Sequence, residues 1–159
     1  MQAFTVRPLA AADLAAAAAI EATAPDPWTA GQLEAELAVQ LAGGAARLFV
    51  AAGEAGPVGL AAYQLAAGEA NLCTFTVAPA ARRQGVGRAL LEQSLAALKA
   101  EGAGSCFLEA RASNAPALAL YGRLGFARVG LRRGFYRAPA EDAVLMAKTL
   151  VPLSAPSAP

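Results

Sequence analysis

Residues 81–91, Ala81-Arg82-Arg83-Gln84-Gly85-Val86-Gly87-Arg88-Ala89-Leu90-Leu91, mark a junction between a strand and a helix. The β-like run 72–77, closed by Pro79, precedes them, and apolar residues with helical spacing follow. Gly85 and Gly87 have no Cβ, so the backbone there can come close to a ligand and its N–H groups can converge on one point. Because a helix start leaves N–H groups unpaired and adds partial positive charge, this segment predicts a phosphate-binding site.

The glycine spacing separates this segment from two other phosphate loops. It has no Gly-Lys-Ser/Thr, which excludes a P-loop of the Walker kind, and it lacks the third glycine of a dinucleotide fingerprint. It does match the pattern Arg/Gln-x-x-Gly-x-Gly/Ala at Arg82, Gly85 and Gly87. An ordinary glycine-containing turn with solvated arginines is the alternative interpretation.

The composition bounds the class of protein. A chain of 159 residues fits one domain and is long enough to bury a core. The net charge of +1 argues against attachment to nucleic acid through the overall field, so we expect no direct nucleic-acid partner. The absence of histidine excludes His-based zinc sites and Ser-His-Asp or Cys-His catalysis, and acid-base chemistry falls to Glu, Asp, Tyr, Cys or Lys. We expect no metal.

The apolar run near the N-terminus and the two cysteines indicate where the protein is located and whether it contains a disulfide. The run 14–20 lies between Asp13 and Glu21 and is too short for a signal-peptide core or a membrane span. It predicts a buried helix of a cytoplasmic protein that has no membrane contact. Cys73 and Cys106 both lie in apolar strand-like runs, which predicts packed thiols rather than a disulfide or a nucleophile.

Turn and cap residues divide the chain into strands and helices. Strands are predicted at residues 4–9, 47–52, 58–66, 71–77, 105–110, 126–130 and 143–150. Helices are predicted from residue 13 to about 22, after a Thr29 cap with Gln32 completing a capping box, over 86–98, and from an Asn114 cap to Gly125. A meander, a crossover helix and a parallel strand indicate an α/β (α+β) fold with a mixed, mostly antiparallel central sheet flanked by helices. We expect one domain at residues 1–150 and a disordered tail at 151–159.

Further motifs lie in the C-terminal half of the chain. They are Leu108-Glu109-Ala110-Arg111-Ala112-Ser113-Asn114, Ala119-Leu120-Tyr121-Gly122-Arg123-Leu124-Gly125-Phe126, Arg132-Arg133-Gly134-Phe135-Tyr136 and Glu141-Asp142-Ala143. With Pro27-Trp28-Thr29 and the glycine pattern, these motifs resemble the GCN5-related N-acetyltransferase (GNAT) superfamily. They are most similar to its ribosomal-protein-alanine N-acetyltransferases (RimI type), and the resemblance covers roughly residues 4–150.

The resemblance implies the GNAT fold and transfer of acetyl from acetyl-CoA, as co-substrate, to the N-terminal alanine of a ribosomal protein. It implies a general base at Glu109, a general acid at Tyr121, and substrate contacts at Trp28 and Tyr136. The implied contacts to acetyl-CoA are the backbone of Phe75, Thr76 and Val77, the loop residues Arg82, Arg83, Gln84, Gly85, Val86, Gly87 and Arg88, and Asn114. We expect a monomer whose protein partner is the ribosomal-protein N-terminus.

Elementary acid-base chemistry supports a carboxylate as the base. An α-amino group has a reference pKa of about 7.7 to 8.0, against about 10.4 for lysine, so roughly a tenth of it is uncharged at neutral pH. A modest base therefore suffices. By alternation Glu109 shares a sheet face with Ser105 and Phe107, at the carboxyl end of its strand, where open sheets bind ligands.

Several alternatives stay open at this stage. Glu109 could be a solvated carboxylate or pair with Arg111, Tyr121 could be a core residue, and Trp28 could pack as a lid. The acceptor could be a lysine side chain, a polyamine or another small amine. A non-catalytic acyl-CoA-binding domain would keep the glycine loop but would not turn over.

Overall fold

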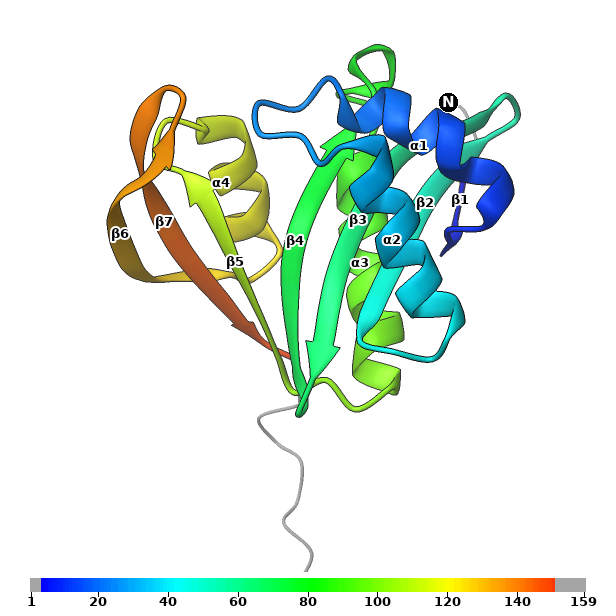
Figure 1. The fold of residues 1–159 in the computed structure, drawn as a ribbon. Coiled ribbons are helices and arrows are strands. Elements are labelled where there is room, and N and C mark those ends of the chain that lie inside the picture. Colours follow the sequence, from blue (N-terminus) through cyan, green and yellow to red (C-terminus); the bar gives the residue numbers. More distant parts are fainter. Residues whose placement is uncertain (1–3, 151–159) are drawn as a thin grey trace, which may run out of the picture.

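The computed structural model describes residues 4–150, so the predicted disordered tail, residues 151–159, lies outside the described part. Seven strands form one sheet in the order β1-β2-β3-β4-β5-β7-β6 (Figure 1). The strands are β1 (Thr5–Pro8), β2 (Ala46–Gly53), β3 (Gly56–Ala66), β4 (Glu69–Val77), β5 (Ser105–Arg111), β6 (Ala127–Arg137) and β7 (Ala140–Thr149). The helices are α1 (Leu14–Glu21), α2 (Ala30–Leu41), α3 (Val86–Ala100) and α4 (Ala115–Arg123), with short 3-10 turns η1 (Ala11–Asp13) and η2 (Pro79–Ala81). The β4–β5 pair is parallel and the other neighbours are antiparallel, which confirms the predicted mixed sheet.

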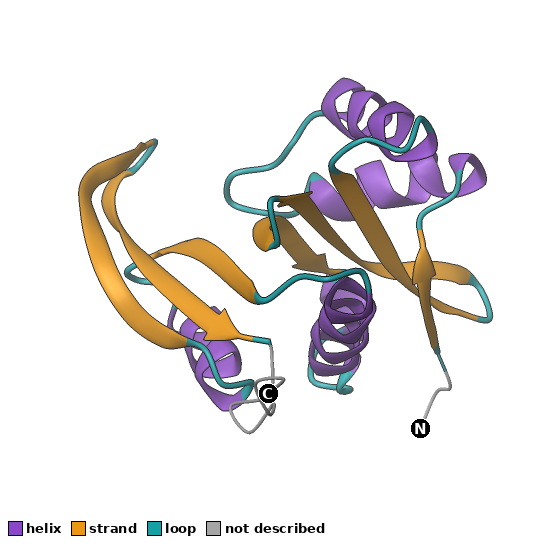
Figure 2. Ribbon diagram, turned by 90° about the horizontal axis from the view of Figure 1, so that it is seen from below, coloured by secondary structure: helices purple, strands orange, loops and turns teal. Residues whose placement is uncertain are grey.

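Helices cover both faces of the sheet (Figures 1 and 2). α1 and α2 lie on one face, while α3 and α4 lie on the other. Leu37 of α2 is buried with Leu48 of β2 in one apolar cluster, and Leu90 and Leu98 of α3 are buried with Leu72 of β4 in a second. The apolar stripes of α2 and α3 therefore meet the apolar side chains of the sheet faces beneath them. None of the helices in residues 4–150 is long and apolar enough to cross a membrane.

Two helices begin at the predicted cap residues. The Thr29 hydroxyl oxygen accepts a hydrogen bond from the Gln32 backbone N–H at 3.1 Å, and the Thr29 N–H donates to the Gln32 side chain at 2.7 Å. At the start of α4 the Asn114 side-chain oxygen accepts from the Ala117 N–H at 3.3 Å. Both bonds satisfy a backbone donor that has no partner within the helix, which confirms the predicted caps.

The predicted ends of the last two strands were wrong. β6 runs to Arg137 rather than to Gly130, and β7 begins at Ala140 rather than at Ala143. The register between β6 and β7 shifts at Arg128/Gly130 and again at Arg132/Tyr136. Because such bulges interrupt the alternation of side chains between the two sheet faces, the apolar pattern that predicts a strand is lost while the pairing continues.

The two cysteines differ in exposure. Both are free thiols, and Cys106 is buried in the core as predicted. Cys73 is exposed, so the prediction of a packed thiol was wrong there. On β4, Cys73 alternates with the buried Leu72 and shares an uncovered sheet face with Glu69 and Asn71.

Candidate functional site

Strands β4 and β5 separate partway along their length (Figure 1). They pair only over residues 69–72 and 105–108, whereas β4 stays paired with β3 as far as Val77. Because successive backbone groups of a strand point to opposite sides, those on the β5 side of β4 beyond residue 72 face a gap rather than a strand. The backbone groups of Phe75 and Val77, which alternate with those of Thr76 and Ala78 that face β3, can therefore offer hydrogen bonds to an extended ligand in this gap.

Helix α3 begins beside this gap without a side-chain cap. Its N-cap, Gly85, has a φ of 79°, which favours glycine. The first hydrogen bond of the helix runs from the Ala89 N–H to the Gly85 carbonyl at 3.1 Å. The N–H groups of residues 86–88 come before this bond in the chain. Such N–H groups have no acceptor within the helix and lie at the positive end of its dipole. This geometry suits an anion.

Close packing and side-chain bonds hold the loop before α3 in place. A Cβ added to Gly87 would lie 3.1 Å from the Phe75 ring, so a larger residue here would make the Phe75 side chain shift by a few tenths of an ångström. Arg82 donates to the Val77 carbonyl at 3.2 Å, and Gln84 donates to the Ala80 carbonyl at 3.2 Å. Arg88 instead pairs with Glu92 along the helix at 2.8 Å. The loop therefore presents chiefly its backbone to a ligand.

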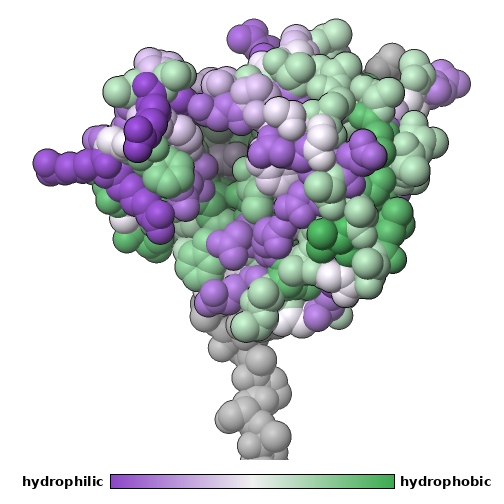
Figure 3. Space-filling model, in the orientation of Figure 1, coloured by the Kyte–Doolittle hydropathy of each residue, from purple (hydrophilic) through white to green (hydrophobic). Residues whose placement is uncertain are grey.

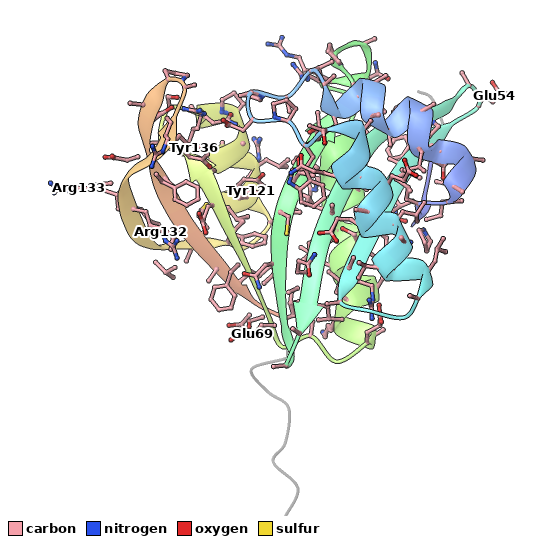
Figure 4. The ribbon with its side chains drawn as sticks, viewed as in Figure 1. Glu54, Glu69, Tyr121, Arg132, Arg133 and Tyr136 are labelled. Carbon is pink, nitrogen blue, oxygen red and sulfur yellow. The ribbon has the colours of Figure 1, made fainter. Side chains whose placement is uncertain are left out.

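A cavity of about 560 Å³ lies along the same gap. Of the residues predicted for the site, it is lined by Phe75, Glu109, Asn114, Tyr121 and Tyr136. In Figure 4, Tyr121 lies between β4 and β5, and Tyr136 lies near the β6–β7 turn. The loop before α3 does not line the cavity. An elongated ligand could therefore place one end in the cavity and its other end at this loop.

Trp28 does not line the cavity. Its ring packs against the apolar cluster beneath α1 and α2, and its backbone N–H donates to Glu21 at 2.9 Å. Packing therefore accounts for this tryptophan, although its neighbours Ala24, Pro25 and Asp26 reach the cavity.

Glu109 places in the cavity a carboxylate that has no bonding partner in the described residues. It is exposed, and it makes no hydrogen bond or ion pair with any residue of the range 4–150. The alternative that pairs it with Arg111 is wrong, because the Arg111 guanidinium bonds Asp26 and Glu141 instead. The carboxylate is free to accept a proton from a group that enters the cavity.

Tyr121 places a buried phenol in the wall of the cavity. Only 6% of the residue is exposed, and its ring centroid lies 6.2 Å from that of Phe75 and 5.8 Å from that of Phe126. Burial raises the pKa of the Tyr121 hydroxyl well above its ordinary value, with a smaller contribution from Tyr136. The hydroxyl therefore stays protonated through the physiological range and can act as a proton donor.

Arg111 forms a bridge over one end of the cavity, a role that the sequence did not predict. Its guanidinium makes two bonds of 2.8 Å to the Asp26 carboxylate, one of 3.3 Å to Glu141 and one of 2.8 Å to the Pro139 carbonyl. It also stacks on the Tyr136 ring, 4.3 Å from the centroid. The α1–α2 loop and the β6–β7 turn are thus joined through one buried side chain.

A second unpredicted residue, Glu21, anchors the α1–α2 loop to β4. Its carboxylate is fully buried and accepts hydrogen bonds from the hydroxyls of Thr74 at 2.7 Å and Thr76 at 2.8 Å, and from the Trp28 N–H. Sequence spacing carries no signal for this group, because Glu21 lies 53 residues from Thr74. The only hint was a carboxylate at the end of an otherwise apolar helix.

Replacing Glu21 with glutamine is expected to destabilise the fold by about 1 to 3 kcal/mol. The glutamine NH₂ group cannot accept the bonds that one carboxylate oxygen accepts, so a buried donor loses its partner. Urea unfolding measures the change, with Glu34→Gln on the exposed face of α2 as the control. Equal stability of the two variants would contradict the anchoring role of Glu21.

Comparison with known proteins links this geometry to one family. The model of the acetyltransferase (GNAT) family matches residues 15–126. The ribosomal protein bS18-alanine N-acetyltransferase of Escherichia coli (strain K12) is 45% identical over 86 residues, which are 53% of this chain and 58% of that protein. The N-alpha-acetyltransferase RimI of Mycobacterium tuberculosis is 44% identical over 78 residues, 49% of this chain and 48% of that protein. These alignments span about half the length of both relatives.

Solved structures extend the likeness over the whole fold. The crystal structure of the Escherichia coli ribosomal-protein-S18-alanine N-acetyltransferase superposes with a TM-score of 0.86 at 33% identity, covering 98% of this chain and 99% of that one. Ard1 from Thermoplasma volcanium shares the fold with a TM-score of 0.83 at 22% identity, covering 94% of this chain and 99% of that one. The predicted fold is thereby confirmed.

Proposed function

The chain belongs to the acetyltransferase (GNAT) family, and on this basis we propose that it transfers acetyl from acetyl-CoA to the α-amine of an N-terminal alanine of a bS18-like ribosomal protein. One observation supports the proposal most. The Glu109 carboxylate, which has no hydrogen-bond or ion-pair partner within residues 4–150, and the buried Tyr121 phenol line one cavity in the gap between β4 and β5. We infer that residues 1–150 form the catalytic domain and that transfer takes place in the cytoplasm.

The residues around the gap fit acetyl-CoA. The uncapped N–H groups at the start of α3 suit its diphosphate, and a Cβ built on Gly85 meets no heavy atom within 4 Å, so the space before the helix is open. The unpaired edge of β4 at Phe75 to Val77 suits the amide groups of the pantetheine arm. Asn114 lines the cavity nearby and keeps its side-chain NH₂ group for a further contact. When bound, acetyl-CoA supplies the thioester that the acceptor amine attacks.

Two side chains of the cavity then take part in proton transfer. Glu109 accepts the proton that the acceptor nitrogen loses as its bond to the acetyl carbon forms. The Tyr121 hydroxyl donates a proton to the sulfur as the carbon–sulfur bond breaks. Burial raises the pKa of this hydroxyl, so the proton is present at the working pH. Glu109 and Tyr121 thus take opposite roles in the proposed reaction, as proton acceptor and proton donor.

The pH dependence of kcat/KM for an Ala-starting peptide should show a rising limb only. The rate should rise about tenfold per pH unit up to pH 7.7 to 8.0, where the α-amine loses its proton, and then level off. Because burial raises the pKa of Tyr121, its hydroxyl keeps the proton at least up to its ordinary value of about 10. Steady-state rates from pH 6 to 9.5 check this. A decline beginning near pH 8 would contradict Tyr121 as the proton donor.

A panel of acceptors tests the proposed substrate class. The wild-type chain is incubated with acetyl-CoA and equal concentrations of an Ala-starting ribosomal peptide, its N-terminally blocked form, a lysine peptide and a polyamine. We expect acetyl transfer to the unblocked peptide only. Faster transfer to lysine or polyamine would replace the proposed acceptor, and binding of acetyl-CoA without any transfer would indicate a non-catalytic domain.

A further inference from the structure

The Arg111 bridge restricts the path of an acceptor chain. Arg111, Asp26 and the carbonyl of Pro139 join the α1–α2 loop to the β6–β7 turn at the carboxyl end of β5, two residues beyond Glu109. A polypeptide whose amine reaches Glu109 cannot continue through this bridge. The cavity extends in the other direction, because its lining reaches down to the exposed Glu69 at the first residue of β4. The acceptor chain must therefore leave along β4, toward the start of the strand.

The floor of this exit path is an uncovered strip of sheet. Glu69, Asn71 and Cys73 of β4 alternate on one face, and all three are exposed and line the cavity. α1 and α2 do not cover this part of β4, because they lie over the neighbouring strands β2 and β3 (Figure 1). The surface is hollowed between the α1–α2 side and β6 (Figure 3). An extended chain can lie in this groove with its backbone over β4.

Each side of the groove has a charged side chain without an ion-pair partner in residues 4–150. Glu69 lies at the foot of the groove and makes no ion pair or hydrogen bond within residues 4–150 (Figure 4). On the opposite wall Arg132 lines the cavity, with its guanidinium 5.8 Å from the centre of the Phe135 ring. The neighbouring Arg133 points away from the groove in Figure 4. A cationic side chain that follows the β4 floor would therefore meet Glu69 and avoid Arg132.

We propose that Glu69 determines acceptor specificity by pairing with a lysine or arginine side chain at about the fourth to sixth residue of the acceptor. Glu69 is opposite Ser105, four residues before Glu109, which places it about 13 Å along the strand at about 3.3 Å per residue. An extended acceptor covers the same distance in about four residues. This inference rests on the proposed function and adds a charge requirement to it.

A charge exchange tests the pairing. Peptides that begin with Ala-Gly and carry lysine, glutamine or glutamate at one position from the third to the seventh are assayed with the wild type, Glu69→Gln and Glu69→Lys. We expect the wild type to favour lysine over glutamine by about twofold to fivefold in kcat/KM at one or two adjacent positions, as for other exposed ion pairs. Glu69→Gln should abolish this preference, and Glu69→Lys should transfer it to glutamate. Glu54→Lys, on the distant β2–β3 turn, is the matched control and should behave as wild type (Figure 4).

The outcomes separate the two proposals. Acetylation that is equal for all peptides, or a Glu69→Lys enzyme that still prefers lysine, would overturn the Glu69 pairing and leave the proposed function standing. A preference for glutamate in the wild type would do the same and would point to Arg132. Transfer to no peptide would overturn both. Acetyl-CoA affinity, measured by calorimetry, should be unchanged in all Glu69 variants, and the lysine preference should weaken in 0.5 M salt.

Discussion

Replacing Tyr121 with phenylalanine is expected to lower kcat for acetyl transfer by a factor of about 10² to 10⁴, the range for loss of a general acid. The hydroxyl is the only atom removed, and it makes no hydrogen bond within residues 4–150 that would be lost. The ring keeps its contacts with Phe75 and Phe126, so the fold should remain intact. Single-turnover rates of peptide acetylation measure the effect, and circular dichroism checks the fold.

Tyr63→Phe is the matched control for that variant. Tyr63 is also buried, but its hydroxyl lies 2.7 Å from the Ser94 hydroxyl in the core beneath α3, away from the cavity. Its loss should reduce stability by about 0.5 to 1.5 kcal/mol and leave turnover unchanged. If Tyr121→Phe kept the wild-type rate, Tyr121 would be a packing residue and another group would protonate the leaving sulfur.

Replacing Glu109 with glutamine should lower kcat/KM for the peptide by about 10² at neutral pH, near the lower end for general-base catalysis. The effect is moderate because about a tenth of an α-amine is already neutral at pH 7. The deficit should shrink as pH rises above 8, because the wild-type rate then levels off while solvent hydroxide increasingly replaces the missing base in the variant. Rates measured between pH 6 and 9.5 give the difference between the two profiles.

Glu109→Gln should leave the affinity for acetyl-CoA within about twofold, because the proposed contacts to acetyl-CoA lie on the edge of β4, at the start of α3 and at Asn114 rather than at Glu109. Glu36→Gln is not a suitable control, since Glu36 accepts a bond from Gln64. Glu34→Gln, exposed on α2, should show wild-type rates throughout. A Glu109→Gln enzyme with the wild-type rate and pH profile would remove Glu109 from the mechanism.

The elements that local chemistry controls were the ones the sequence predicted well. The capping box at Thr29, the Asn114 cap and the glycines at the start of α3 each act within a few residues, so local sequence spacing predicts them. The end of β6 was missed because two bulges break its alternation. The exposed face of Cys73 was missed because an apolar run does not reveal which sheet face is left uncovered by helices.

The candidate site was predictable only in part for the same physical reason. Glu109 and Tyr121 follow recognisable motifs, and the fold brings both into one cavity. The Arg111–Asp26 bridge joins residues 85 apart in sequence, and Glu21 bonds hydroxyls of β4 that lie 53 and 55 residues away. Such contacts depend on where the whole chain places its loops, and no local pattern encodes them. These contacts were therefore visible only in the folded molecule.

The gap between β4 and β5 is the feature on which the proposed activity depends, and a crystal structure of the chain with acetyl-CoA examines it directly. We expect the diphosphate on the N–H groups of residues 85–88, the pantetheine along the free edge of β4, and the thioester beside Tyr121 and Glu109. A diphosphate bound elsewhere, or a thioester outside the cavity, would contradict the proposed acetyl transfer.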